Sequence, residues 1–134
     1  MTKIIDIEGV GPKSAEALGA AGITTTAALL KAGGAPAGRK ALAEKTGIDV
    51  KKILEWVNRS DLMRIKGVGE EYSDLLENAG VDTVKELAAR KPENLHAKIL
   101  EVNAAKDSVR RPPTAAAVAA WVAEAKTLPP AVTY

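Results

Sequence analysis

The fold is decided by the stretch Ile4-Ile5-Asp6-Ile7-Glu8-Gly9-Val10-Gly11-Pro12-Lys13-Ser14-Ala15-Glu16-Ala17-Leu18, whose pattern returns 58 positions later in residues 62–76. Aliphatic residues, a Gly-Val-Gly triplet, a small residue and a leucine occupy matching places in both copies. The matched pairs are Ile4 and Leu62, Ile7 and Ile65, Gly9 and Gly67, Val10 and Val68, Gly11 and Gly69, Ala15 and Ser73, and Leu18 and Leu76. An Ala-Gly-aliphatic triplet follows each copy at the same offset. The pattern therefore indicates two copies of one supersecondary unit.

The composition favours closely packed helices. Of the 134 residues, 46% are hydrophobic, and these are mostly Ala, Leu, Val and Ile, with no Phe. Small aliphatic side chains suit helices that pack closely, and this length fits one compact domain or two small halves with a shared core. No apolar run approaches the ~18 residues of a membrane-spanning helix, and the acidic residues near the start argue against a signal peptide. We expect a cytoplasmic protein without membrane contact.

The net charge of +2 is unevenly distributed. Residues 61–84, which include the second Gly-Val-Gly triplet, hold two basic and six acidic side chains. Residues 1–60 and 85–111 each have a net charge of +3, from nine basic against six acidic side chains and from seven against four. The overall balance makes no case for nucleic acid by itself, because a strong electrostatic footprint needs a basic patch.

Helical periods dominate the first half, where only Ile5-Asp6-Ile7 alternates like a strand. Proline and glycine mark helix starts and ends, and Thr25 and Asp49 are suitable N-caps. The expected helices run from Pro12 to about Ala20, from Thr25 to Gly33-Gly34, from Pro36 to Gly47, and from Asp49 through Val57.

The second half repeats this scheme. Thr83-x-x-Glu86 has the form of a capping box, and Thr114 is a suitable N-cap for the last helix. The expected helices run from about Asp61 to Lys66, from Gly69 to Asn78, after Thr83, from Pro92 through Val102, and from Thr114 through Ala125. We expect Trp56 and Trp121 in the core as counterparts, displaced by seven residues. The predicted repeats are 1–60 and 61–128, packed about a pseudo-two-fold axis into one compact domain, with a frayed tail at 129–134.

Two glycines around one aliphatic residue allow a tight reversal between helices, because glycine adopts positive φ and lets another group approach the main chain. Both copies resemble the helix-hairpin-helix motif in their glycines, their aliphatic residues and the small residue that follows, with Ser73 in place of the usual alanine. We expect Val10 and Val68 to form the core of each hairpin.

The chain from about Ile4 to Pro129 is also similar to a bacterial family of unknown function built from tandem helix-hairpin-helix-like repeats. The resemblance is strongest in Leu62–Tyr72, Pro92–Lys98 and Val109–Pro112. It implies an all-α fold with two tandem hairpin units and further packed helices, and it implies no particular activity.

In the wider superfamily the hairpin cradles a phosphate, because amides at a helix start and the helix dipole favour an anion. The resemblance therefore implies a non-catalytic module that binds the nucleic-acid backbone without reading sequence, and some relatives also hold a monovalent cation on hairpin carbonyls. The residues implied in nucleic-acid binding are Gly9, Gly11, Lys13, Arg64, Lys66, Gly67, Gly69, Arg110 and Arg111.

Local charges favour a second hypothesis, in which the chain is a protein-interaction or scaffolding domain and its hairpins are structural turns. Glu70 and Glu71 occupy the helix start after the second turn, where they complement the helix dipole and repel phosphate. The acidic pair is therefore interpreted as helix stabilisation, and Arg110 and Arg111 as a solvated connector.

We expect no enzyme, no cofactor and no small-molecule substrate. The chain has no Cys, and its single histidine, His96, cannot form a histidine metal cluster by itself. We expect a packing or capping role for His96. The first Gly-Val-Gly stretch lacks the third glycine and the preceding buried strand of a dinucleotide fingerprint, and the Gly-Lys-Ser/Thr phosphate loop is absent as well.

Overall fold

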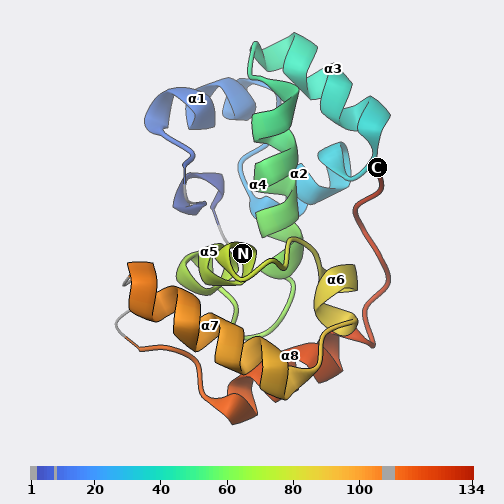
Figure 1. Ribbon diagram of the computed structural model, residues 1–134. Coiled ribbons are helices and arrows are strands. Elements are labelled where there is room, and N and C mark those ends of the chain that lie inside the picture. Colours follow the sequence, from blue (N-terminus) through green and yellow to red (C-terminus); the bar gives the residue numbers. More distant parts are fainter. Residues whose placement is uncertain (1–2, 8, 107–110) are drawn as a thin grey trace. The chain divides into compact units, whose positions relative to one another are not determined.

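The computed structural model describes residues 3–7, 9–106 and 111–134. Contacts divide the chain into two compact units: Met1–Asp61 together with Ala131–Tyr134, and Leu62–Pro130. Across the described residues every regular element is helical, with eight α-helices and one short 3-10 helix (Figure 1). The all-α fold class is thus confirmed.

The first unit contains η1 (Ile4–Asp6), α1 (Pro12–Ala20), α2 (Thr26–Gly33), α3 (Pro36–Thr46) and α4 (Val50–Leu62), whose last residue opens the second unit. The local signals act as predicted. The Thr25 hydroxyl accepts a hydrogen bond from the Ala28 amide at 3.1 Å, and the Asp49 carboxylate accepts one from the Lys51 amide at 2.9 Å. Gly47 ends α3 with a φ of 73°, a conformation that favours glycine.

The second unit contains α5 (Glu70–Asn78), α6 (Val84–Ala88), α7 (Pro92–Lys106) and α8 (Ala115–Ala125). Thr83 and Thr114 cap α6 and α8 by accepting from the Glu86 and Ala117 amides. The Glu86 carboxylate reaches the Asp82 amide at 3.4 Å and the Thr83 hydroxyl at 3.4 Å. In the expected capping box the Glu86 carboxylate would accept from the amide of the N-cap residue, Thr83. Here it accepts from the amide of the preceding residue, Asp82.

Two expected elements differ from the structure. The helix expected from Asp61 to Lys66 is absent, because α4 continues to Leu62 and only turns follow. No glycine or proline lies between Val50 and Lys66, so the sequence has no stop signal that would separate two helices there. The residues that alternate like a strand form the 3-10 helix η1 and its C-cap, since the Ile7 amide donates to the Ile4 carbonyl at 3.2 Å.

Each unit has a core of aliphatic residues around one tryptophan. The α2–α3 pair and the α1–η1 pair pack in the first unit, and α8 packs on α6 and α7 in the second. The first core contains Ile4, Ile7, Val10, Leu18, Ile23, Leu29, Leu42, Ile53, Trp56, Val57 and Val132. The second contains Leu62, Ile65, Val68, Leu75, Leu76, Val81, Leu87, Leu95, Ile99, Val118, Trp121 and Val122. The prediction that both tryptophans are core residues is confirmed.

The last residues differ from the frayed tail that the sequence predicts. Residues 131–134 belong to the first unit, where Val132 is buried and the Thr133 amide donates to the Gly34 carbonyl at 2.8 Å. The segment has no regular secondary structure, so its place depends on these contacts and not on any local signal.

Candidate functional site

The first Gly-Val-Gly turn connects η1 to α1 through one bend. Gly9 has a φ of 89°, which lies in the region that favours glycine, and the Val10 amide donates to the Ile7 carbonyl at 3.1 Å. Gly11 is the N-cap of α1, and its carbonyl accepts from the Ala15 amide at 3.0 Å. Val10 is buried, with 6% of its surface exposed, so the bend is anchored in the first core.

The second turn has the same geometry at the matching positions. Gly67 also has a φ of 89°, and the Val68 amide donates to the Ile65 carbonyl at 3.1 Å. Gly69 is the N-cap of α5, and its carbonyl accepts from the Ser73 amide at 2.9 Å. Val68 is 4% exposed. The two turns thus match residue by residue in backbone conformation, hydrogen bonding and burial.

A tryptophan lies beside the first glycine of each turn. A Cβ on Gly9 would lie 3.6 Å from the indole nitrogen of Trp56, and a Cβ on Gly67 would lie 3.5 Å from that of Trp121. Both indole nitrogens thus lie beside the first glycine of their own turn, although the sequence separates the two tryptophans by seven residues more than the two glycines. Both distances are ordinary van der Waals contacts, so positive φ and not crowding is what requires glycine here.

At the second glycine of each turn, neither the backbone conformation nor crowding by neighbouring atoms requires glycine. Gly11 has φ −82° and ψ 174°, and Gly69 has φ −103° and ψ −158°, conformations open to any residue. Beyond the immediate chain neighbours, no atom of the described residues lies within 4 Å of a Cβ built at either position. Both glycines are exposed. The main chain at the start of α1 and α5 therefore has no side chain over it, although the fold would accommodate one at both positions.

Around the first turn, a cation and unpaired amides face solvent. Lys13 is exposed, and the Lys13 and Ser14 amides have no hydrogen-bond acceptor among the described residues, as is usual in the first turn of a helix. Lys3 lines a shallow pocket of about 570 Å³ together with Glu16, so a carboxylate shares the space around this second cation.

The second turn differs because other residues of the second unit make hydrogen bonds to the residues around it. The Lys66 amide donates to the Glu124 carboxylate on α8 at 3.1 Å, so a negative group already lies on the loop. The Arg64 guanidinium, which was expected to meet phosphate, donates to the Pro129 carbonyl at 2.8 Å. The Lys66 side chain is exposed. Sequence reasoning missed the role of Glu124, since a contact across 58 positions leaves no local signal.

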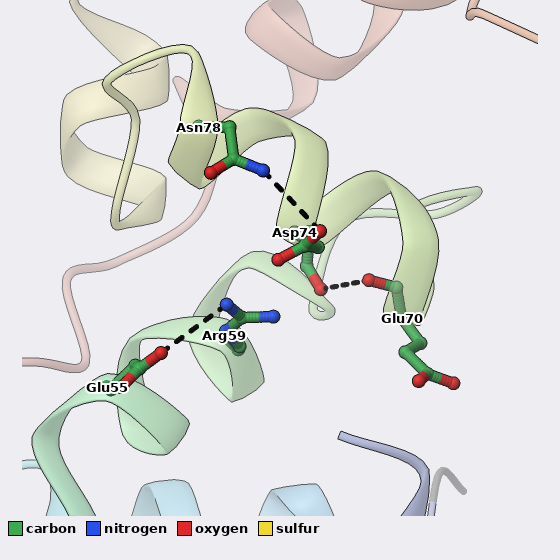
Figure 2. A network of polar contacts seen from close by, with 6 residues as sticks. Glu55, Arg59, Glu70, Asp74 and Asn78 are labelled. Atoms are coloured by element: carbon green, nitrogen blue, oxygen red, sulfur yellow. Dashed lines mark hydrogen bonds and ion pairs between the residues drawn. The ribbon is translucent and has the colours of Figure 1, made fainter. Parts of the chain in front are cut away.

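Acidic residues begin α5, as the sequence indicates. Glu70 and Glu71 are exposed in its first turn, and one turn later the Asn78 amide donates to the Asp74 carboxylate at 3.5 Å (Figure 2). No group of three His, Cys, Asp or Glu side chains in the described part of the chain is placed to hold a metal ion. The first turn of α5 therefore presents negative charge to solvent, which complements the helix dipole.

Two further predicted contact residues, Arg110 and Arg111, precede α8 in the chain. Arg110 lies outside the described residues, and Arg111 is exposed, with its carbonyl accepting from the Tyr72 hydroxyl at 3.0 Å. The Nε2 atom of His96 lies within hydrogen-bonding distance of the Pro113 carbonyl, at 3.1 Å. On α4 of the first unit, Glu55 and Arg59 form an ion pair at 3.5 Å (Figure 2).

Comparison with known proteins identifies a family for this chain. The family described as "Domain of unknown function (DUF4332)" matches residues 8–128. No curated protein and no solved structure matches the chain. Within the described residues, none of the helices has both the length and the apolar character needed to cross a membrane.

Proposed function

The chain belongs to this family of unknown function, and we propose that it is a non-catalytic module built from two tandem helix-hairpin-helix units, which binds the nucleic-acid backbone through its first turn. The observation that carries the proposal is the bare main chain at Gly11. A glycine that neither conformation nor packing requires is suited to the close approach of an external group, here a phosphate oxygen.

The chemistry around Gly11 supports an anionic ligand. The free Lys13 and Ser14 amides and the dipole of α1 direct partial positive charge at the same point, and the exposed Lys13 ammonium adds a full charge. Because few cations take part, binding should be weak and independent of sequence, roughly 10⁻⁴–10⁻⁶ M at physiological salt. Each phosphate contact contributes about 0.9 to the slope of log K against log salt concentration, so one or two contacts predict a slope of about −1 to −2.

The test is a titration of fluorescent duplex DNA at low and moderate salt. Lys13→Glu should abolish measurable binding at moderate salt, and Lys13→Gln should reduce the salt slope by about 1. Gly11→Ala should weaken binding without unfolding the chain, because an alanine fits the φ of Gly11 and meets no other atom.

The matched control is Gly69→Ala, the same change at the equivalent position of the second turn. It is equally compatible with the fold, and DNA binding should not change, because the Glu124 carboxylate already occupies that loop. An absence of binding at low salt, or an equal effect of both alanines, would refute the proposal.

The alternative function is protein interaction, and the second turn favours it. Its loop amide is satisfied by Glu124, Arg64 is held by the Pro129 carbonyl, and Glu70 and Glu71 present negative charge to solvent. A partner for this turn would carry basic side chains. Light scattering and pull-down with a Glu70→Lys, Glu71→Lys chain as control test this alternative, since the reversed charges should release such a partner.

A further inference from the structure

Residues 131–134 lie along the first unit as an extended segment, held by contacts of a kind that peptide ligands make. The Thr133 amide donates to the Gly34 carbonyl at 2.8 Å, and the Thr133 carbonyl accepts from the Arg39 guanidinium at 2.7 Å. Val132 is buried with 8% of its surface exposed. The Tyr134 hydroxyl donates to the Asn58 side-chain carbonyl at 3.1 Å. Main-chain bonds with one buried side chain give both affinity and selectivity in peptide recognition.

Arg39 is the central residue of this surface, and its environment is unusual for a buried cation. It is 5% exposed, and in the described part of the chain all its hydrogen bonds go to main-chain carbonyls, those of Gly33 at 2.9 Å, Gly34 at 3.0 Å and Thr133 at 2.7 Å. Its guanidinium carbon lies 5.9 Å from the centre of the Tyr134 ring. A buried arginine without a carboxylate needs acceptors from elsewhere, and the segment supplies one of three.

The second unit has no buried arginine at the position that corresponds to Arg39. Counting from the proline that begins α3 and α7, the position of Arg39 corresponds to Leu95, which is fully buried in the second core. An ordinary core residue therefore serves the second unit, whereas the first unit has a donor directed at a peptide carbonyl.

Gly34 permits the close approach of the segment. A Cβ at this position would lie 2.4 Å from the Ala131 carbonyl oxygen, nearer than real side chains allow, although the φ of −64° is open to any residue. The glycine thus makes room for the main chain at Ala131 and also for the Leu30 carbonyl of α2, which would lie 2.9 Å from the same Cβ, whereas its own φ does not require glycine.

We propose that the surface formed by Gly33, Gly34, Arg39 and Asn58 is a peptide-binding site, and that residues 131–134 are its tethered, detachable ligand. The ligand class is an extended peptide with a β-branched apolar residue followed two positions later by tyrosine. Detachment needs little rearrangement, because the segment has no regular secondary structure, Thr133 and Tyr134 are exposed, and Pro129-Pro130 precede it. This site is independent of nucleic-acid binding at the first turn.

The test uses the full chain and a fluorescent peptide with the sequence of residues 128–134 and blocked ends. Val132→Asp in the chain places a charge at a buried position and should release the tethered segment. The free peptide should then bind the variant about tenfold more tightly than the unaltered chain, if the tether acts at roughly 1 mM and the peptide Kd is about 0.1 mM. Arg39→Met added to the variant should remove binding.

The matched control is the same peptide with Val132→Asp, which neither chain should bind. If the variant keeps its helical circular dichroism and does not bind the unaltered peptide, the proposal is overturned. Equal affinity of the peptide for both chains would overturn it as well.

Hydrogen exchange of the unaltered chain decides the case even if the variant does not fold. A detachable ligand predicts that the Thr133 amide is protected, yet exchanges at least tenfold faster than core amides such as that of Leu29. Exchange at the rate of Leu29 would make the segment an integral part of the unit, and full exposure would mean that it is not bound. Either result overturns the proposal.

Discussion

The two glycines of each turn should respond differently to alanine, although they are two residues apart. Gly9 and Gly67 have a φ of 89°, which L-residues rarely adopt, whereas Gly11 and Gly69 have extended backbones with negative φ. Gly9→Ala and Gly67→Ala should therefore destabilise the chain, and Gly11→Ala and Gly69→Ala should not.

The magnitude follows from the backbone and the contacts. A left-handed conformation costs an L-residue roughly 1–2 kcal/mol, and the tryptophan nitrogens at 3.6 and 3.5 Å add no steric clash. At the second glycine, the smaller entropy of unfolded alanine stabilises by about 0.4–1 kcal/mol. Alanine is a poorer N-cap than glycine by a similar amount, so the net change should stay within about 0.5 kcal/mol.

Urea unfolding followed by circular dichroism measures all four variants. For a domain of 60–100 residues, each kcal/mol lowers Tm by roughly 4–8 °C, so the first-glycine variants are also resolved by thermal unfolding. The reasoning is refuted if Gly11→Ala costs as much as Gly9→Ala, or if Gly9→Ala has no cost. Unequal losses for Gly9→Ala and Gly67→Ala would mean that the matching geometry of the turns does not carry matching energetics.

Four further substitutions test a buried hydrogen-bond donor, the packing of the core and two N-caps. Arg39→Met should destabilise the first unit by about 2–3 kcal/mol, because buried carbonyls lose their donor; a loss below about 0.5 kcal/mol in urea would contradict this. Leu18→Ala should cost about 2–5 kcal/mol, since a fully buried leucine leaves a cavity, and unchanged thermal stability would argue against that burial. Thr25→Ala and Thr83→Ala should each cost about 1 kcal/mol through loss of an N-cap, whereas a neutral result would show that water replaces the hydroxyl.

Local signals were enough for most helix boundaries. Pro12 begins α1, Gly22 follows its end with a φ of 87°, and Thr114 caps α8, each as predicted. These signals work because they involve a backbone conformation or a hydrogen bond within a few residues. They failed between Asp61 and Lys66, where the expected first residue, Asp61, is an internal residue of α4 and no helix-breaking residue intervenes.

The candidate site was predicted only in part. The repeated glycines located both turns, and their common spacing predicted equivalent backbones. The charges around them could not be paired from sequence, because Glu124 meets the Lys66 amide across 58 positions and Arg64 meets the Pro129 carbonyl across 65. These contacts make the second turn self-occupied, whereas Lys13 at the first turn is exposed.

By itself, the sequence determined most of the helical segments, where glycine bends the chain and that the bend occurs twice. Tertiary structure alone decided which side chains meet at each bend, and that Arg39 receives the Thr133 carbonyl from 94 positions away. The physical reason is the separation along the chain of the groups that interact. Backbone conformation and capping depend on neighbours along the chain, whereas a buried guanidinium takes whichever acceptor the packed helices bring within hydrogen-bonding distance.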